Sequence, residues 1–268
     1  MVLKNSIKIV KEIIENRKLL FNLAKNDFKT KFAGSYFGIF WAFVQPIVTV
    51  LVYWFVFQIG FGAQPVNGCP YVLWLTAGLV PWFYFSDLLN GGTNAFLEYN
   101  YLVKKVVFQI SILPAVKVFS ALFVHCFFVL VAVIICTCYG KFPDLYTLQI
   151  IYYTFALTIF GLAISYFTSS IVIFFKDLSQ VIMIVLQVGV WITPIMWQLE
   201  ILPPVWQFVM KLNPLFYIVR GYRQALLDKE WFWTYWQSTL YFWLITVVLL
   251  LFNTRVYSKL KEHFSDVL

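Results

Sequence analysis

Charged residues are scarce in this sequence. Asp, Glu, Lys and Arg make up 12% of the 268 residues, whereas 62% are hydrophobic and 21% are aromatic. A soluble domain has about a quarter of its residues charged, so this composition excludes the soluble class. Between Lys31 and Asp87 the chain carries no charge at all. Because long apolar runs satisfy their backbone hydrogen bonds as helices inside lipid, we expect one all-α, polytopic membrane protein.

Motifs for catalysis and metal binding are also missing. The chain has no G-x-x-x-x-G-K-[ST] loop and no H-E-x-x-H pair. Its cysteines, among them Cys69, Cys136 and Cys138, have no zinc-site spacing. We therefore predict a chain that is not an enzyme and holds no metal, cofactor or nucleotide of its own. Asp87 and His125 are ionisable residues inside apolar segments, where a proton relay and a helix-packing role are both open.

Six apolar segments approach the roughly 20 residues that a helix needs to cross a bilayer. They lie near residues 36–60, 71–93, 113–139, 148–175, 180–197 and 238–255. The chain then divides into a leader of residues 1–35, a six-span domain of residues 36–255 and a tail of residues 256–268. The leader is charged and amphipathic, unlike a secretory signal peptide.

The cations predict the orientation, because Lys and Arg are retained on the cytoplasmic side during insertion. With six spans, fifteen of the twenty fall on the side of the termini: Lys4, Lys8, Lys11, Arg17, Lys18, Lys25, Lys29, Lys31, Lys104, Lys105, Lys117, Lys176, Arg255, Lys259 and Lys261. Lys141, Lys211, Arg220, Arg223 and Lys229 fall on the other side. We therefore expect both termini in the cytoplasm, facing anionic lipid and an acidic protein partner rather than nucleic acid.

The leader has the pattern of an amphipathic helix. Val10, Ile13, Ile14, Arg17 and Phe21 follow one helical stripe, and most of the charges lie off it. This predicts a helix lying on the inner leaflet, with a solvated helix packed on the chain's own loops as the alternative.

Two further segments have unusual mixtures of apolar and charged residues. Residues 95–112 combine Glu98, Tyr101, Lys104 and Lys105 with apolar positions. They predict either a short cytoplasmic helix that docks into a partner protein or an interfacial helix with snorkelling lysines. Residues 198–236 are too apolar for a solvated loop and too charged for a span, and their Pro203-Pro204 and Asn213-Pro214 pairs predict two short re-entrant helices in the outer leaflet.

The order of these elements resembles a known family. The chain is similar to the membrane subunit of bacterial ABC exporters for polysaccharides, which move O-antigen, capsule and teichoic-acid polymers. The similarity rests on GSYFGIFWAFVQP at 34–46, GLVPWFYFSDLL at 78–89, YLVKKVVFQISILP at 101–114, FFKDLSQ at 174–180, ITPIMW at 192–197 and LNPLFYIVRGYRQALL at 212–227. Gln109 and Lys176 depart from the proline and arginine that the family often has there.

The resemblance implies a transport subunit energised by a separate protein. Such a permease works as two copies bound to two copies of a P-loop ATPase, which holds the ATP and Mg, in the bacterial cytoplasmic (inner) membrane. Glu98, Tyr101, Lys104 and Lys105 would then belong to the helix that couples the permease to the ATPase. The substrate would be a polysaccharide or teichoic-acid polymer on a polyprenyl carrier.

Aromatic side chains are candidates for the substrate pathway, because flat rings let the C–H faces of sugars slide without a fixed hydrogen-bond register. The set is Tyr36, Phe37, Phe40, Trp41, Trp191 and Trp197. For Tyr36 and Phe37 an aromatic belt at the lipid interface fits equally well.

Arg220 and Arg223 lie three residues apart on one face of an outer helix. We expect Arg223, the position that matches the family motif, to hold the phosphate of a lipid carrier with two hydrogen bonds or to contact the emerging glycan at the outer leaflet. An ion pair between Arg223 and Asp228 or Glu230, and snorkelling to lipid headgroups, are the alternatives.

Other functions are open to a chain of this class. A proton-coupled carrier predicts internal repeats and more intramembrane acids, and a lipid-linked glycosyltransferase or acyltransferase needs a cluster of catalytic residues; the sequence has neither. An ABC permease for a lipid or a drug-like small molecule is the main alternative.

Overall fold

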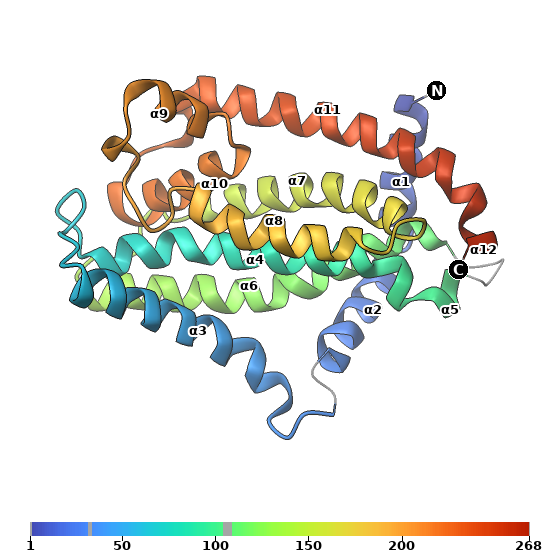
Figure 1. Ribbon diagram of the computed structural model, residues 1–268, viewed down its shortest axis with the longest axis horizontal. Coiled ribbons are helices and arrows are strands. Elements are labelled where there is room, and N and C mark those ends of the chain that lie inside the picture. Colours follow the sequence, from blue (N-terminus) through green and yellow to red (C-terminus); the bar gives the residue numbers. More distant parts are fainter. Residues whose placement is uncertain (1, 32–33, 104–108, 268) are drawn as a thin grey trace.

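The chain forms a helical bundle with short helices at both ends (Figure 1). The computed structural model describes residues 2–31, 34–103 and 109–267, and their side chains except those of 2–6, 265 and 266. Within these ranges the chain is helical apart from loops and one isolated bridge between Val66 and Cys69. The helices are α1 (Val2–Glu15), α2 (Arg17–Thr30), α3 (Trp41–Trp54), α4 (Tyr71–Glu98), α5 (Asn100–Val103), α6 (Leu113–Cys138), α7 (Gln149–Val172), α8 (Leu178–Ile192), α9 (Pro204–Lys211), α10 (Pro214–Arg223), α11 (Trp236–Leu260) and α12 (Phe264–Val267).

Five helical stretches of the described chain are long and apolar enough to cross a membrane. They are Gly38–Gly60, Tyr71–Glu98, Ile110–Cys138, Gln149–Val172 and Phe232–His263. The predicted fifth span, residues 180–197, is represented by α8, which has 15 residues. At 1.5 Å per residue α8 is about 22 Å long, shorter than a hydrocarbon core of roughly 30 Å. The multi-pass architecture is confirmed, and the count of six spans stays a prediction.

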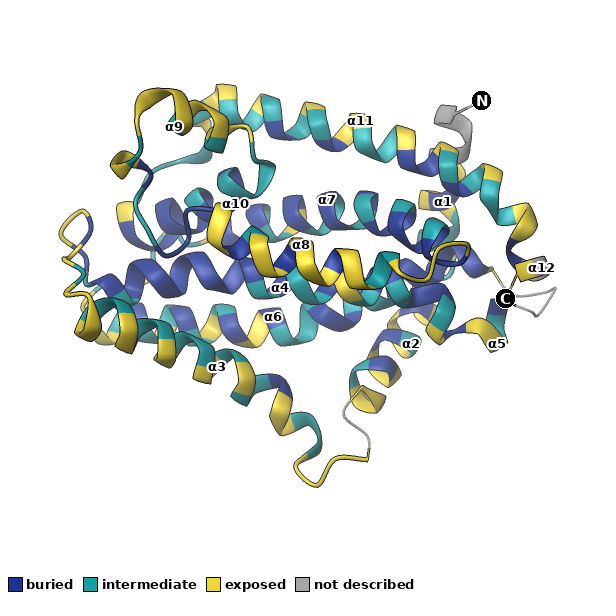
Figure 2. Ribbon diagram, in the orientation of Figure 1, coloured by how far each residue is buried: buried dark blue, intermediate teal, exposed yellow. Residues whose placement is uncertain are grey.

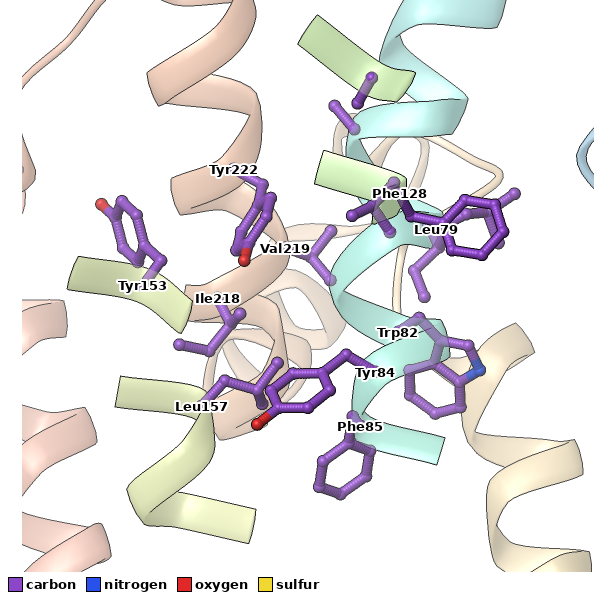
Figure 3. Packing of buried hydrophobic residues seen from close by; sticks show 14 of the residues in the cluster. Leu79, Trp82, Tyr84, Phe85, Phe128, Tyr153, Leu157, Ile218, Val219 and Tyr222 are labelled. Carbon is purple, nitrogen blue, oxygen red and sulfur yellow. The ribbon is translucent and has the colours of Figure 1, made fainter. Parts of the chain in front are cut away.

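The core lies around α4, which packs against α6 and α7, while α7 packs against α11. Figure 3 shows aromatic and aliphatic side chains of α4, α6, α7 and α10 meeting there. Small residues let these helices approach closely: a Cβ atom on Gly221 would lie 2.1 Å from the ring of Tyr153, and one on Gly161 would lie 2.2 Å from Leu88. Close contact at glycine is the usual means by which membrane helices associate.

Both termini lie at the same end of the bundle, together with α1, α2 and α5 (Figure 1). We call it the terminal end and the other the distal end. At the terminal end α1 and α2 lie across the bundle axis. Ile9, Leu20 and Ala24 face the protein, whereas Val10 and Ile14 are exposed. The predicted amphipathic leader is therefore helical, with part of its apolar stripe left for lipid.

The distal end contains the two short helices that the sequence predicts for residues 198–236. Pro204 begins α9 and Pro214 begins α10. Asn213 caps α10, because its side-chain oxygen accepts a hydrogen bond from the backbone N–H of Leu215 at 3.0 Å. Insertion of these helices into a leaflet stays a prediction.

The face formed by α3 and α8 is largely exposed (Figure 2). Only 6% of the most apolar part of Gly38–Gly60 is buried, compared with 78% for Tyr71–Glu98. The two helices meet through Tyr53 and Trp191, whose ring centroids are 6.1 Å apart. A first span so little packed against its own chain leaves a large apolar surface for lipid or another protein.

Candidate functional site

A polar cavity of about 700 Å³ lies at the distal end of the bundle. We call it the distal vestibule. Its lining is Val66, Asn67, Trp74, Lys141, Pro194, Gln198, Leu199, Glu200, Gln207, Lys211, Phe216, Arg220, Arg223, Gln224, Leu227, Asp228, Glu230 and Tyr235. Four cations and three acids therefore face one cavity, which suits a ligand with both hydroxyl groups and negative charge.

Arg223 lies in the wall of the vestibule and is 7% exposed. Its Nη1 and Nη2 donate to the carbonyls of Pro194 at 2.9 Å and Ile195 at 2.7 Å, and its Nε donates to the carbonyl of Trp74 at 3.3 Å. The guanidinium also lies 3.4 Å from the ring centroid of Trp74. Burial lowers the pKa of Arg223 to about 9, so the group stays charged at neutral pH. Arg223 thus joins α10 to α4 and to the segment that follows α8.

The contacts of Arg223 provide hydrogen-bond donors for buried carbonyls of backbone that is not helical. The chain leaves the helix at Thr193, where ψ is 128°. Non-helical backbone is tolerated inside a membrane only where protein or water satisfies its polar groups. Gly78 on α4 makes the space for this contact, since a Cβ atom there would lie 2.8 Å from Nη2 of Arg223.

Arg220 has a different environment from Arg223, although both line the vestibule. Its guanidinium lies 3.8 Å from the ring centroid of Tyr235, and the residue is only partly buried. Within residues 2–31, 34–103 and 109–267 Arg220 donates to no backbone carbonyl, so its N–H donors remain available to an occupant of the cavity that it lines. The two arginines that the sequence places on one face therefore differ. Arg223, the predicted phosphate contact, donates to backbone carbonyls, whereas Arg220 lines the cavity; the phosphate role itself stays a prediction.

Two of the three acids of the vestibule, Asp228 and Glu230, lie just after α10. Burial raises the pKa of Asp228. Glu230 accepts a hydrogen bond from Gln224 at 3.1 Å. Buried Gln149 on α7 donates to the carbonyl of Glu230 at 2.9 Å and accepts from the backbone N–H of Phe232 at 2.7 Å. These contacts fix the loop between α10 and α11 as one wall of the vestibule.

The predicted pathway aromatics form two groups at opposite ends of the α3 and α8 face. Tyr36, Phe37, Phe40 and Trp41 are exposed and contact one another, with ring centroids 5.3 to 6.5 Å apart. Trp191 and Trp197 lie at the distal end of α8, where Nε1 of Trp197 donates to the carbonyl of Trp191 at 2.8 Å. Five of the six are exposed, Trp197 is partly buried, and their role in a pathway stays a prediction.

A second cavity, of about 440 Å³, lies between α3, α4, α6 and α8. Asp87 lines it and forms an ion pair with Lys31. His125 also lines it, but its Nε2 lies 2.8 Å from the hydroxyl of Tyr222 and 3.1 Å from Oγ1 of Thr154. Asp87 and His125 thus have separate partners, an arrangement that favours the helix-packing role over a relay.

The described parts of the predicted coupling segment, residues 95–103 and 109–112, lie at the terminal end, beside α1 and α2 (Figure 1). Glu98 ends α4 and Tyr101 lies in α5, and both are exposed. Lys104 and Lys105 lie outside the described residues. Lys117 on α6 pairs with Glu98 and with Asp27 on α2, and the Asp27 contact is 2.6 Å. The hydroxyl of Tyr99 also donates to Asp27, at 2.8 Å.

This ionic network was not predicted from the sequence. Asp27 and Lys117 are 90 positions apart, and their side chains are 7% and 10% exposed. One signal was available: Asp27 is the only acid in the sequence between Glu15 and Asp87. The network, with hydrogen bonds from Ser111 to Glu12 and from Asn16 to Gln109, holds both ends of the 95–112 segment against α1 and α2. These contacts hold residues 95–103 and 109–112 rigidly against α1 and α2, which suits a segment that contacts a partner protein.

The comparisons with known proteins agree with this architecture. Residues 18–227 match the ABC-2 type transporter family. The chain is 26% identical to the O-antigen export system permease protein RfbA of Myxococcus xanthus over 97% of its own length and 99% of that protein. It is 25% identical to the O-antigen export system permease protein RfbA of Klebsiella pneumoniae, over 93% of this chain and 95% of that protein. The matched residues include the coupling segment, the α3 and α8 face and both vestibule arginines. Because the match covers most of the sequence, this chain belongs to the ABC-2 type transporter family.

Proposed function

We propose that this chain is the membrane subunit of an ATP-driven exporter that moves a lipid-linked polysaccharide out of the bacterial cytoplasm. The observation that carries the proposal is the end-to-end match to O-antigen export permeases, which covers 97% of this chain and 99% of the relative. A partner ABC ATPase, two copies of each subunit and cytoplasmic termini belong to the same proposal.

The two ends of the bundle suit the two tasks of such a subunit. At the terminal end, the Asp27–Lys117–Glu98 network fixes the segment that would meet the ATPase. A movement imposed there would pass directly into α2, α4 and α6, because each contributes one of these side chains. The exposed face of α3 and α8 supports pairing with a second copy around a shared pathway, along which the aromatic side chains would lie.

At the distal end, we assign the contact with the carrier phosphate or the emerging glycan to Arg220. Its guanidinium faces a polar cavity and can present two parallel donors to a phosphate. Arg223 has its donors on three carbonyls and acts as a positioning residue for α10. Lys211 lines the same cavity and adds a second positive charge.

The test is export by cells that depend on this chain. Depletion of the chain should lower surface polysaccharide and raise the amount of lipid-linked glycan inside the cell. Replacement with Arg220→Gln should reproduce the defect at normal membrane levels of the protein. Lys229→Gln is the matched control, because Lys229 pairs with Asp144 at 2.6 Å and does not line the vestibule. Unchanged surface polysaccharide after depletion would exclude the proposed substrate class.

A further inference from the structure

An apolar groove of about 490 Å³ runs along α7. Eight of its lining residues come from α7 and recur every three or four positions: Ile151, Thr154, Phe155, Thr158, Ile159, Leu162, Ala163 and Tyr166. Phe119 and Leu122 of α6 and Leu250 and Thr254 of α11 also line it. From Ile151 to Tyr166 the groove follows fifteen helical steps, which is about 22 Å.

The four polar side chains that line the groove, Thr154, Thr158, Tyr166 and Thr254, already have hydrogen-bond partners within the protein. Oγ1 of Thr154 is bonded to the hydroxyl of Tyr222 at 2.6 Å, and Oγ1 of Thr158 donates to the carbonyl of Thr154 at 2.7 Å. Tyr166 donates to the carbonyl of Ser111 at 2.7 Å. Thr254 donates to carbonyls of its own helix. An occupant of this groove must therefore be a hydrocarbon chain, because water would find no partner.

At the terminal end, the groove meets α1. Ile9, Val10, Ile13 and Ile14 line that end. The backbone stays nearly helical beyond Ile14, since the N–H of Asn16 bonds to the carbonyl of Glu12 at 3.1 Å and that of Leu20 to the carbonyl of Asn16 at 2.8 Å. Arg17 and Lys18 follow within one turn and line a shallow surface hollow with Phe21 and Asn22. A cationic surface thus adjoins the mouth of a hydrocarbon groove.

We propose that an anionic phospholipid binds here, with one acyl chain along α7 and its phosphate beside Arg17 and Lys18. The groove is about 22 Å long, which exceeds half of the roughly 30 Å hydrocarbon core of a bilayer. It can therefore hold a whole acyl chain of a lipid from the leaflet on the side of the termini. Charge complementarity selects an anionic headgroup over a zwitterionic one. The bound acyl chain fills the space between α1 and α7 and so stabilises the position of α1. Since α2 follows α1 directly, the lipid also supports the Asp27–Lys117–Glu98 network. This site does not depend on the exported substrate.

The test is native mass spectrometry of the full-length chain, purified in a mild detergent and titrated with phosphatidylglycerol, phosphatidylcholine or polyprenyl phosphate. Wild type should retain phosphatidylglycerol in preference to the other two. Ile159→Trp, which fills the groove at a partly buried position, should lose this adduct. Val185→Trp is the matched control, because it adds the same ring to the exposed face of α8, away from the groove.

A second pair of variants tests the headgroup contact. Arg17→Gln/Lys18→Gln should bind phosphatidylglycerol roughly thirty-fold more weakly, the loss expected for two interfacial cations, with phosphatidylcholine binding unchanged. Lys25→Gln/Lys29→Gln removes the same charge from exposed positions of α2 outside the hollow and should bind as wild type does. Equal retention of phosphatidylglycerol by wild type and Ile159→Trp would refute the groove as the site, and a preference for polyprenyl phosphate would refute the occupant.

Discussion

Removing the amine of Lys117 gives the sharpest test of the terminal-end network. Lys117→Met leaves the Asp27 carboxylate buried, with the hydroxyl of Tyr99 as its remaining hydrogen-bond donor. Because both side chains of the pair are at most 10% exposed, the loss should resemble that of breaking a buried ion pair, about 3–5 kcal/mol. Lys229→Met is the matched control: it breaks an ion pair whose side chains are 38% and 31% exposed, and should cost about 0–1 kcal/mol.

The measurement is the thermal midpoint of the purified chain in one detergent. The midpoint of Lys117→Met should fall by about 10 °C and that of Lys229→Met by a few degrees at most. Replacing the whole polar group with Asp27→Leu/Lys117→Met/Tyr99→Phe should recover most of the loss, because no buried polar atom is then left unpaired. Equal midpoints for Lys117→Met and Lys229→Met would refute the argument that the network is a buried, stabilising unit.

Three further predictions follow from the same geometry. Gly78→Ala should displace the Arg223 guanidinium and lower the free energy of unfolding by about 1–3 kcal/mol in a thermal assay. Gly91→Ala on the same helix is the control; its Cβ would lie 3.6 Å from the nearest neighbour, so the loss should be less than half as large. A cysteine at Lys229 should react with an impermeant thiol reagent from outside the cell and one at Arg255 only after permeabilisation; the reverse pattern would contradict the proposed orientation. The purified chain should hydrolyse no ATP alone, and affinity purification after co-expression should recover a P-loop ATPase; ATP hydrolysis by the isolated chain would contradict its assignment as a permease.

The sequence alone was sufficient for the class of protein and for the positions of most helices. Scarce charge and long apolar runs identify a membrane protein, because the cost of burying backbone and charge in lipid depends on composition and length rather than on detailed packing. The break between α9 and α10 was predictable for a similar reason: Pro214 cannot continue the helix before it, and Asn213 is a good cap. Both are local properties of the chain.

The predicted fifth span shows where hydropathy stops being informative. Residues 180–197 carry no charge and are mostly apolar, yet the helix ends at Ile192 and the chain continues in non-helical form. The carbonyls released there are satisfied by Arg223, which comes nearly thirty positions later. A window of local hydropathy cannot register such a partner, because the cost of leaving the helix depends on what packs beside it.

Only the tertiary structure decided what the charged residues do. The sequence put Arg220 and Arg223 on one helix face and favoured Arg223 as the phosphate contact. In the structure Arg223 packs against Trp74 and Gly78 and donates to three backbone carbonyls, whereas Arg220 lines the vestibule without such bonds among the described residues. Likewise Lys117 counted as one cytoplasmic cation among fifteen until it was found paired with Asp27. Periodicity indicates which residues lie on one face of a helix, and composition indicates which segments lie in lipid and which in water. The partner of a buried charge is set by the packing of distant helices, which the local sequence does not encode.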